Sequence, residues 1–218
     1  MQPKLRALFF DFDGVILDSV PTKTKAFQIL FGDYPTEIIE KVLEHHRMHG
    51  GISRVEKIAH AHAHFIGTPL SEQELEKWAT RFSALVIEEV IGSNWIEGAR
   101  EYLEHIRNSE LKVFVISGTP QDELRYIIEK KGLKDIFHEQ LGSPIKKPAH
   151  ITTLLKRYQL RPADCVFIGD AFTDYDAAKD TGLHFIGIQG DVTFPDDTIV
   201  LPNCCGLETA INDMFKTR

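Results

Sequence analysis

The amino-acid sequence predicts an α/β protein built around a parallel sheet, and three observations lead to this prediction. A short apolar run, 8–10, lies near the N-terminus and is followed by a turn residue, Gly14. From about residue 97 onward, short apolar runs alternate with segments of helical periodicity. Between these parts, residues 21–91 show helical periodicity and no convincing strand. Because strands that alternate with helices pair in parallel, the first run must join the same sheet as the later ones.

The predicted elements can be given in chain order. The helical block contains helices over 36–47 and 71–90, the second opened by a Ser71–Glu74 capping box. The later part contains helix 99–108, strand 113–116, helix 121–131, helix 149–158, strand 166–168, a helix through 178 and strand 185–188. We therefore expect a Rossmann-like parallel sheet core flanked by helices, formed by 1–17 and 96–218, and an inserted α-helical cap domain over 18–95.

Composition and charge narrow the class of protein. The chain has 218 residues, a formal net charge of -7 and no run rich in Lys or Arg, which argues against a nucleic-acid partner. It shows no signal peptide and no apolar stretch long enough to span a membrane. The three cysteines form no spaced metal or redox pair, which is typical of a reducing compartment. We therefore expect a cytoplasmic protein without a membrane partner, as a monomer or a homodimer.

Two carboxylates stand one residue apart where the first strand ends, in the segment Asp11-Phe12-Asp13-Gly14. Such close acids repel one another and lose water together, and a cation normally offsets this cost. The pair therefore suggests a hard metal ion, Mg²⁺, and a carboxylate available as a nucleophile. By itself, the same pattern also fits a turn that caps the strand or a structural calcium site.

Three further polar features follow strands or lie in loops of the alternating region. Ser117-Gly118-Thr119 comes directly after the apolar run 113–116 and offers a hydroxyl group and backbone N–H groups that can donate hydrogen bonds to phosphate oxygens. Lys146-Lys147-Pro148 lies in a predicted loop before a helix. Asp170 and Asp174 follow the strand 166–168. Each feature alone also fits a helix cap or a solvated loop, but together they predict a single site at one edge of the sheet.

This order of motifs resembles the haloacid dehalogenase-like superfamily of phosphohydrolases, in the group of phosphoglycolate phosphatase and β-phosphoglucomutase. The matching residues are Asp11-Phe12-Asp13-Gly14, Ser117, Lys147 and Gly169-Asp170 through Asp174. The resemblance implies that Asp11 is the nucleophile and forms an aspartyl-phosphate, and that Asp13 is the general acid and base. The helical block stands where this family carries a small cap.

The same resemblance implies the ligands of the metal and of the phosphate. Mg²⁺ would be held by Asp11, the backbone carbonyl of Asp13 and Asp170, with Asp174 in the second shell. The transferring phosphoryl group would be held by three groups: Ser117, the Gly118 N–H and Lys147. Lys147 is preferred to Lys146 because the family lysine commonly precedes proline.

Asp13 separates the subfamilies, since the relatives that cleave carbon–halogen or phosphonate bonds lack an acid at this position. We therefore expect a Mg²⁺-dependent phosphatase that hydrolyses a small phosphorylated metabolite, such as a sugar phosphate or phosphoglycolate, through an aspartyl-phosphate. One alternative is a phosphomutase of the β-phosphoglucomutase type. Another, of a different class, is a non-catalytic regulatory protein that binds a phosphorylated metabolite.

The cap contains the candidates for substrate choice. The segment Gly51-Ile52-Ser53-Arg54 resembles the cap loop of β-phosphoglucomutase, although Gly50 stands where that enzyme has a basic residue. Arg54 either contacts the substrate or is a surface residue paired with an acid such as Glu56 or Glu40. His60 and His64 have the i, i+4 spacing of a metal pair, but we expect solvated or packed side chains instead. Cys204-Cys205 is expected to fill buried apolar volume.

Overall fold

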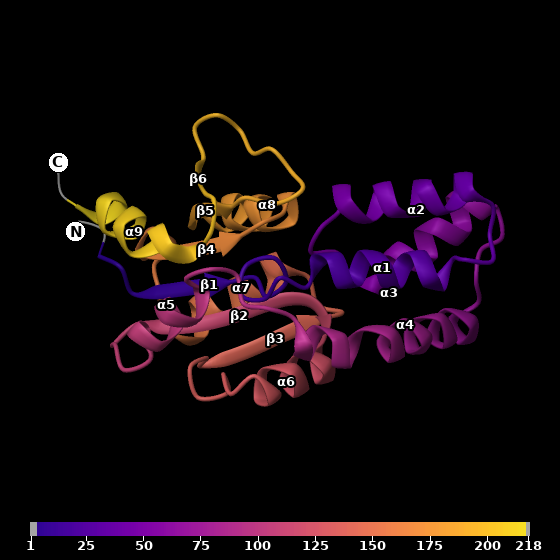
Figure 1. Ribbon diagram of the computed structural model, residues 1–218. Coiled ribbons are helices and arrows are strands. Elements are labelled where there is room, and N and C mark those ends of the chain that lie inside the picture. The colour runs from indigo at the N-terminus through magenta and orange to yellow at the C-terminus, as the bar shows by residue number, and fades with distance from the viewer. Residues whose placement is uncertain (1–3, 217–218) are drawn as a thin grey trace.

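A central sheet of parallel strands organises the molecule, as the computed structural model of residues 4–216 shows (Figure 1). The sheet has six strands in the order β3-β2-β1-β4-β5-β6. Their bounds are β1 Ala7–Phe10, β2 Lys112–Pro120, β3 Glu139–Ser143, β4 Cys165–Gly169, β5 His184–Ile188 and β6 Ile199–Leu201. The predicted α/β fold is therefore confirmed, and the N-terminal strand lies in the middle of the sheet, paired with β2 and β4.

Helices cover both faces of this sheet. They are α5 Ala99–Ile106, α6 Gln121–Lys130, α7 Lys147–Arg157, α8 Phe172–Thr181 and α9 Leu207–Phe215. Leu8 and Phe10 of β1 pack in the core cluster that includes α5, α6 and α9 residues, whereas Phe9 packs in the cluster that includes α7 and α8 residues. Since both faces of the strand are buried, its sequence is continuously apolar rather than alternating.

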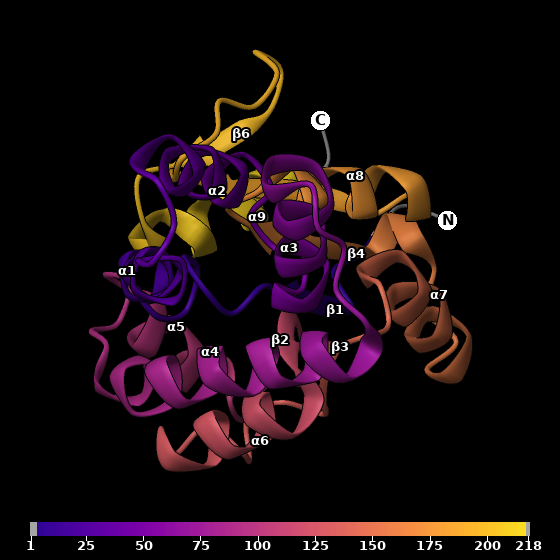
Figure 2. The same ribbon diagram turned by 90° about the vertical axis from the view of Figure 1, so that its right-hand side faces the viewer.

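The remaining helices gather at one end of the molecule, to the right in Figure 1 and in front in Figure 2. They are α1 Val20–Leu30, α2 Thr36–Met48, α3 Arg54–His60, a π-helical turn Ala61–Ile66 and α4 Glu72–Gly92. The predicted capping box at Ser71 and Glu74 is present at the start of α4. The chain enters and leaves this block at one place, where the Ile96 N–H donates to the Ile16 carbonyl at 3.0 Å.

The structure corrects several sequence-based expectations. The edge strands β3 and β6 were not predicted. Strand β3 has only one large apolar residue, and β6 has only three residues, two of them exposed. Strand β2 extends to Pro120 with a shift of register after Ile116, so Ser117 to Thr119 lie in its irregular end rather than beyond it. Lys147 is the first residue of α7 rather than part of the preceding loop.

The described residues contain no helix with the length and apolarity needed to cross a membrane. The cysteines differ in exposure: Cys165 and Cys204 are buried, whereas Cys205 is exposed. The expectation that the pair 204–205 fills buried volume is therefore wrong for Cys205. The two residues are neighbours in a 3₁₀ turn, Cys204–Gly206, and only the first of them reaches the core.

Candidate active site

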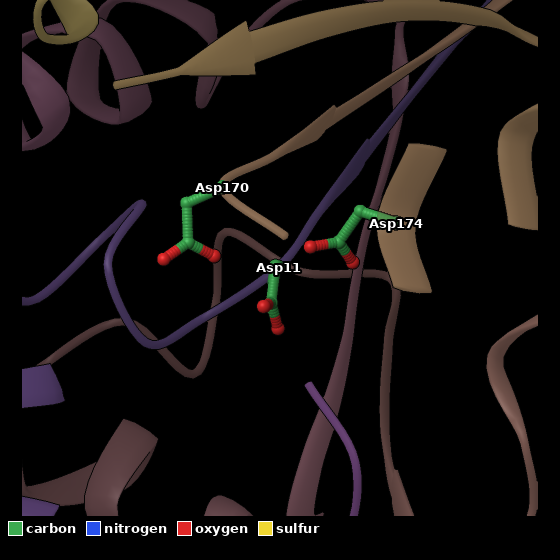
Figure 3. Close-up of side chains that lie close together, drawn as sticks. All are labelled: Asp11, Asp170 and Asp174. Atoms are coloured by element: carbon green, nitrogen blue, oxygen red, sulfur yellow. The ribbon is translucent and has the colours of Figure 1, made fainter. Parts of the chain in front are cut away.

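Three aspartates meet at the carboxyl edge of the sheet (Figure 3). Asp11 directly follows β1, Asp170 directly follows β4, and Asp174 lies in the first turn of α8. Strands β1 and β4 are hydrogen-bonded neighbours, which brings their ends together. Carboxylate oxygens of the three residues lie within 4.8 Å of one another, and no other such cluster of three or more metal-ligating side chains occurs within residues 4–216.

The electrostatics of this cluster favour a cation. Burial, together with the charge of Asp174, raises the pKa of Asp11 to about 7, although Lys147 acts in the opposite direction. Burial and the charge of Asp11 also raise the pKa of Asp170 well above its usual value. The donors are carboxylate oxygens, which are the ligands that hard divalent cations prefer. The residues present therefore fit a hard divalent metal ion, whose charge would offset their mutual repulsion.

One lysine balances part of this negative charge. Lys147 is buried, its ammonium group lies 3.1 Å from Asp11 Oδ2, and it also forms an ion pair with Asp174 Oδ1. Lys146 is different, because 79% of its side chain is exposed and its nearest acid is Glu56, at 4.0 Å. The beginning of α7 thus brings Lys147, and not Lys146, to the acidic cluster.

Asp13 has an environment of its own. Its carboxylate accepts hydrogen bonds from Ser19 Oγ at 2.6 Å, Thr119 Oγ1 at 3.1 Å and Ser117 Oγ at 3.3 Å, and it forms an ion pair with Lys23 at 2.5 Å. Burial acts to raise its pKa, but the charge of Lys23 and these hydrogen bonds outweigh burial and lower the pKa to about 2. The two members of the Asp-x-Asp pair therefore differ in the direction of their pKa shifts: the pKa of Asp11 is raised, and the pKa of Asp13 is lowered.

Glycines let the loop between α2 and α3 approach the sheet edge. A Cβ at Gly118 would lie 2.4 Å from the Gly51 carbonyl oxygen, and a Cβ at Gly51, whose φ is +75°, would lie 2.2 Å from Thr173 Oγ1. Gly50 contributes through its carbonyl, which accepts a hydrogen bond from Thr173 Oγ1 at 2.7 Å. Larger residues at Gly51 or Gly118 would separate the two parts of the molecule.

Arg54 is not a surface residue, and its partner is neither Glu56 nor Glu40. It is buried, and its guanidinium group binds Glu123 of α6 at 2.7 and 2.9 Å and Ser83 Oγ of α4 at 2.6 Å. The ring of Phe82 lies 4.8 Å below the guanidinium carbon. Because Arg54 belongs to α3 and Glu123 to a helix that flanks the sheet, this ion pair fastens the helical block to the rest of the molecule.

A cavity of about 700 Å³, counting the space open to solvent at its mouth, joins the two parts. Asp11, Asp13 and Asp170 line one side of it. The other side includes three residues that the sequence analysis missed, Lys23, His46 and Lys57. No local motif marks these residues, because they are single polar positions on three different helices and converge only when the helices pack.

Four histidines of the helical block form a stack of rings. The rings of His45 and His49, of His45 and His60, and of His60 and His64 have centroids 4.1, 4.1 and 4.4 Å apart. Among the described residues they do not form a group of three or more ligands that converge on one point. Burial and the neighbouring histidines lower the pKa of His45 to about 4.

Curated relatives resemble the chain over nearly all of its length. The N-acetylmuramic acid 6-phosphate phosphatase of Pseudomonas putida is 22% identical, over 99% of this chain and 95% of the relative. The phosphoglycolate phosphatase of Synechococcus elongatus is 23% identical, over 84% of each. The phosphorylated carbohydrates phosphatase of Thermotoga maritima is 26% identical, also over 84% of each.

Solved structures share the fold of this chain, and a family sequence model matches most of its length. A β-phosphoglucomutase of Clostridium difficile superimposes with a TM-score of 0.78 at 19% identity, over 97% of both chains. A predicted phosphoglycolate phosphatase of Haemophilus somnus gives a TM-score of 0.74 at 19% identity, over 95% of this chain and 98% of the other. The sequence model of the haloacid dehalogenase-like hydrolases matches residues 5–182. As the motifs at the strand ends predicted, the chain belongs to the haloacid dehalogenase-like hydrolase family.

Proposed function

We propose that this hydrolase is a Mg²⁺-dependent phosphatase that acts on a small phosphorylated metabolite, such as a carbohydrate phosphate or phosphoglycolate. The observation that carries the proposal is the division of the acids at the sheet edge. Asp11, Asp170 and Asp174 form a cluster that fits a divalent cation, whereas Asp13 stands apart among hydrogen-bond donors. Relatives named as phosphatases of phosphoglycolate and of phosphorylated carbohydrates support the substrate class.

In the first half of the proposed reaction, an oxygen of Asp11 attacks phosphorus and the bond to the leaving oxygen breaks. Asp13 gives that oxygen a proton. In the second half, Asp13 takes a proton from water, the water oxygen attacks the phosphoryl group, and inorganic phosphate and free Asp11 result. The donors that surround Asp13 favour its carboxylate, which is the form required as the base in this second half.

The proposed function also assigns the residues that hold the metal ion and the phosphoryl group. Asp11, the Asp13 carbonyl and Asp170 would hold Mg²⁺, with Asp174 in support. When bound, the ion supplies positive charge that screens the nucleophile from the substrate. Ser117, the Gly118 N–H and Lys147 hold the phosphoryl oxygens, and Lys147 lies near the nucleophile in a position to do so.

We assign residues 18–95 as the cap, and 1–17 with 96–218 as the core. The cap closes the cavity from the side opposite the carboxylates, which excludes water from the aspartyl-phosphate while the leaving group departs. We place the enzyme in the cytoplasm as a monomer or homodimer, and light scattering after size-exclusion chromatography distinguishes these two states.

The test is phosphate release from a panel of monoesters that includes p-nitrophenyl phosphate, sugar phosphates and 2-phosphoglycolate. We expect turnover with Mg²⁺, loss of turnover with a chelator, and a loss of roughly 10⁴-fold in Asp11→Asn. Normal turnover by Asp11→Asn would exclude Asp11 as the nucleophile. Complete inactivity of the wild-type chain on the panel would instead support a non-catalytic protein that binds a phosphorylated metabolite.

The mutase alternative has one specific observation in its favour, the fold shared with proteins titled β-phosphoglucomutase. A mutase returns the phosphoryl group to the sugar, whereas a phosphatase gives it to water. Incubation with a sugar phosphate and its bisphosphate therefore separates them. An isomeric sugar phosphate as the main product identifies a mutase, and inorganic phosphate identifies the proposed phosphatase.

A further inference from the structure

The wall of the cavity formed by the cap contains a lysine that is almost completely buried. Lys57 is 5% exposed, lies on α3 and lines the cavity opposite the carboxylates. Its ammonium group contacts only neutral atoms among the described residues, His46 Nδ1 at 2.9 Å and the His46 carbonyl oxygen at 3.2 Å. A buried ammonium without a carboxylate partner is costly, because the protein supplies no opposite charge in place of the lost water.

Two other cations at the cavity, the half-buried Lys23 and the buried Arg54, already have acidic partners. Lys23 pairs with Asp13, and Arg54 pairs with Glu123. Arg47 also lines the cavity, but it is exposed, so that solvent screens its charge. Lys57 is therefore the buried cation on this wall that is left to bind a charged group of a ligand.

His46 holds the ammonium group of Lys57 in place. It is 6% exposed, it lines the same cavity, and its Nε2 has no hydrogen-bond partner among the described residues. Because Nδ1 accepts from the ammonium group of Lys57, the ring proton of the neutral imidazole must be on Nε2. Burial and the charge of Lys57 lower the pKa of His46 to about 2, so that the ring stays neutral.

We infer that Lys57 binds a carboxylate carried by the leaving group of the substrate, an inference that rests on the proposed phosphatase function. Lys57 offers one positive charge at this wall, which matches the single charge of a carboxylate. A second phosphate would bring more negative charge than this wall has free cations to meet. A neutral sugar hydroxyl would leave the buried ammonium without a counter-charge.

The pKa of Lys57 agrees with the binding of an anion. Burial and the charge of Lys23 lower the pKa of Lys57 to about 7, although the carboxylates across the cavity act in the opposite direction. An anionic ligand next to Lys57 would favour the ammonium form, which is the donor. The substrate class is therefore that of small phosphate monoesters with a carboxylate on the leaving group.

The test compares two esters of similar size that differ in this group, 2-phosphoglycolate and 2-hydroxyethyl phosphate, in wild type and in Lys57→Met. We expect the variant to lose roughly 30- to 100-fold in kcat/KM on 2-phosphoglycolate, mainly through KM, and less than about threefold on 2-hydroxyethyl phosphate. His46→Phe, which keeps an aromatic ring but removes the Nδ1 that accepts from Lys57, should lose about tenfold on 2-phosphoglycolate alone. Lys25→Met, at an exposed position of α1, is the matched control and should behave as wild type.

Binding provides a readout that does not depend on turnover. In full-length Asp11→Asn with Mg²⁺, calorimetry should show tighter binding of 2-phosphoglycolate than of 2-hydroxyethyl phosphate, and Lys57→Met should abolish the difference. Equal losses on both esters would overturn the inference and indicate that Lys57 only supports the cap. Wild-type inactivity on every ester, with the carboxylate-dependent binding retained, would overturn the phosphatase and leave the carboxylate site intact. If Lys57→Met does not fold, as circular dichroism would show, His46→Phe decides between these outcomes.

Discussion

The two walls of the cavity between the proposed core and the proposed cap differ in charge and in origin. The core wall is acidic and carries Asp11, Asp13 and Asp170 at strand ends, whereas the cap wall is basic and carries His46 and Lys57 on helices. The strand ends are fixed by backbone hydrogen bonds to their neighbours, while the cap residues depend on how the helices pack. This difference suggests that the core carries out phosphoryl transfer and that the cap selects the leaving group.

After the loss expected for Asp11→Asn, the largest effect is expected from a second residue of the core wall, in Asp13→Asn. The amide cannot exchange a proton as the carboxyl group does, so kcat should fall by roughly 10³-fold on 2-phosphoglycolate. The loss should be smaller on p-nitrophenyl phosphate, whose leaving group needs no proton. Steady-state kinetics on both esters check this prediction, and equal losses would argue against Asp13 as the general acid.

The next effect concerns the lysine that balances the core acids. Lys147→Met leaves Asp11 and Asp174 buried without their cation, and we expect a loss of about 3 kcal/mol in the free energy of unfolding and roughly 10²-fold in kcat. Urea unfolding and kinetics measure both quantities. Lys146→Met is the matched control, and an equal loss in that exposed neighbour would reverse the assignment between the two lysines.

The ion pair between cap and core gives a smaller effect. Glu123→Gln removes the carboxylate that binds Arg54, so that the closed arrangement should lose about 1–2 kcal/mol and kcat/KM should fall by roughly tenfold. Limited proteolysis should cut the linkers near residues 17 and 95 faster. Glu76→Gln, at an exposed position of the cap helix α4, is the control, and an equal change in both variants would show that the pair does not fasten the cap.

The last prediction concerns how the stability of the protein depends on pH through His46. Burial lowers the pKa of His46 to about 2 from the 6.5 of an unperturbed histidine, so below about pH 6.5 the unfolded chain binds a proton that the folded chain does not. The free energy of unfolding should therefore decrease as pH falls from 6.5. The contribution of His46 is about 1.4 kcal/mol per pH unit once the unfolded form is fully protonated.

Urea unfolding between pH 6.5 and 4.5 tests this slope. His46→Phe should flatten it, whereas His105→Gln, an exposed position on the core helix α5, should not. An unchanged slope in His46→Phe would mean that the acid sensitivity has another origin.

The core was more predictable from the sequence than the cap, for a physical reason. Buried parallel strands need continuous apolar runs, and short polar motifs at their ends converge once the strands pair, so Asp11 and Asp170 could be placed together in advance. The edge strands β3 and β6 are short and partly exposed, and they were missed. Lys57 and His46 have no motif, because their contact depends on the packing of α2 against α3. Arg54 was recognised, but its partner Glu123 is distant in sequence and could not be inferred.

The unequal exposure of the three thiols makes the motion of the cap measurable. Burial raises the pKa of Cys165 and of Cys204 to about 12, so neither forms a reactive thiolate at neutral pH, whereas Cys205 is exposed on the core. A fluorophore can therefore be attached to Cys205 without replacing the other two cysteines. A second dye on a cysteine introduced at the exposed Met48 of the cap would form an energy-transfer pair. The natural chain thus needs one substitution to report opening and closing during turnover.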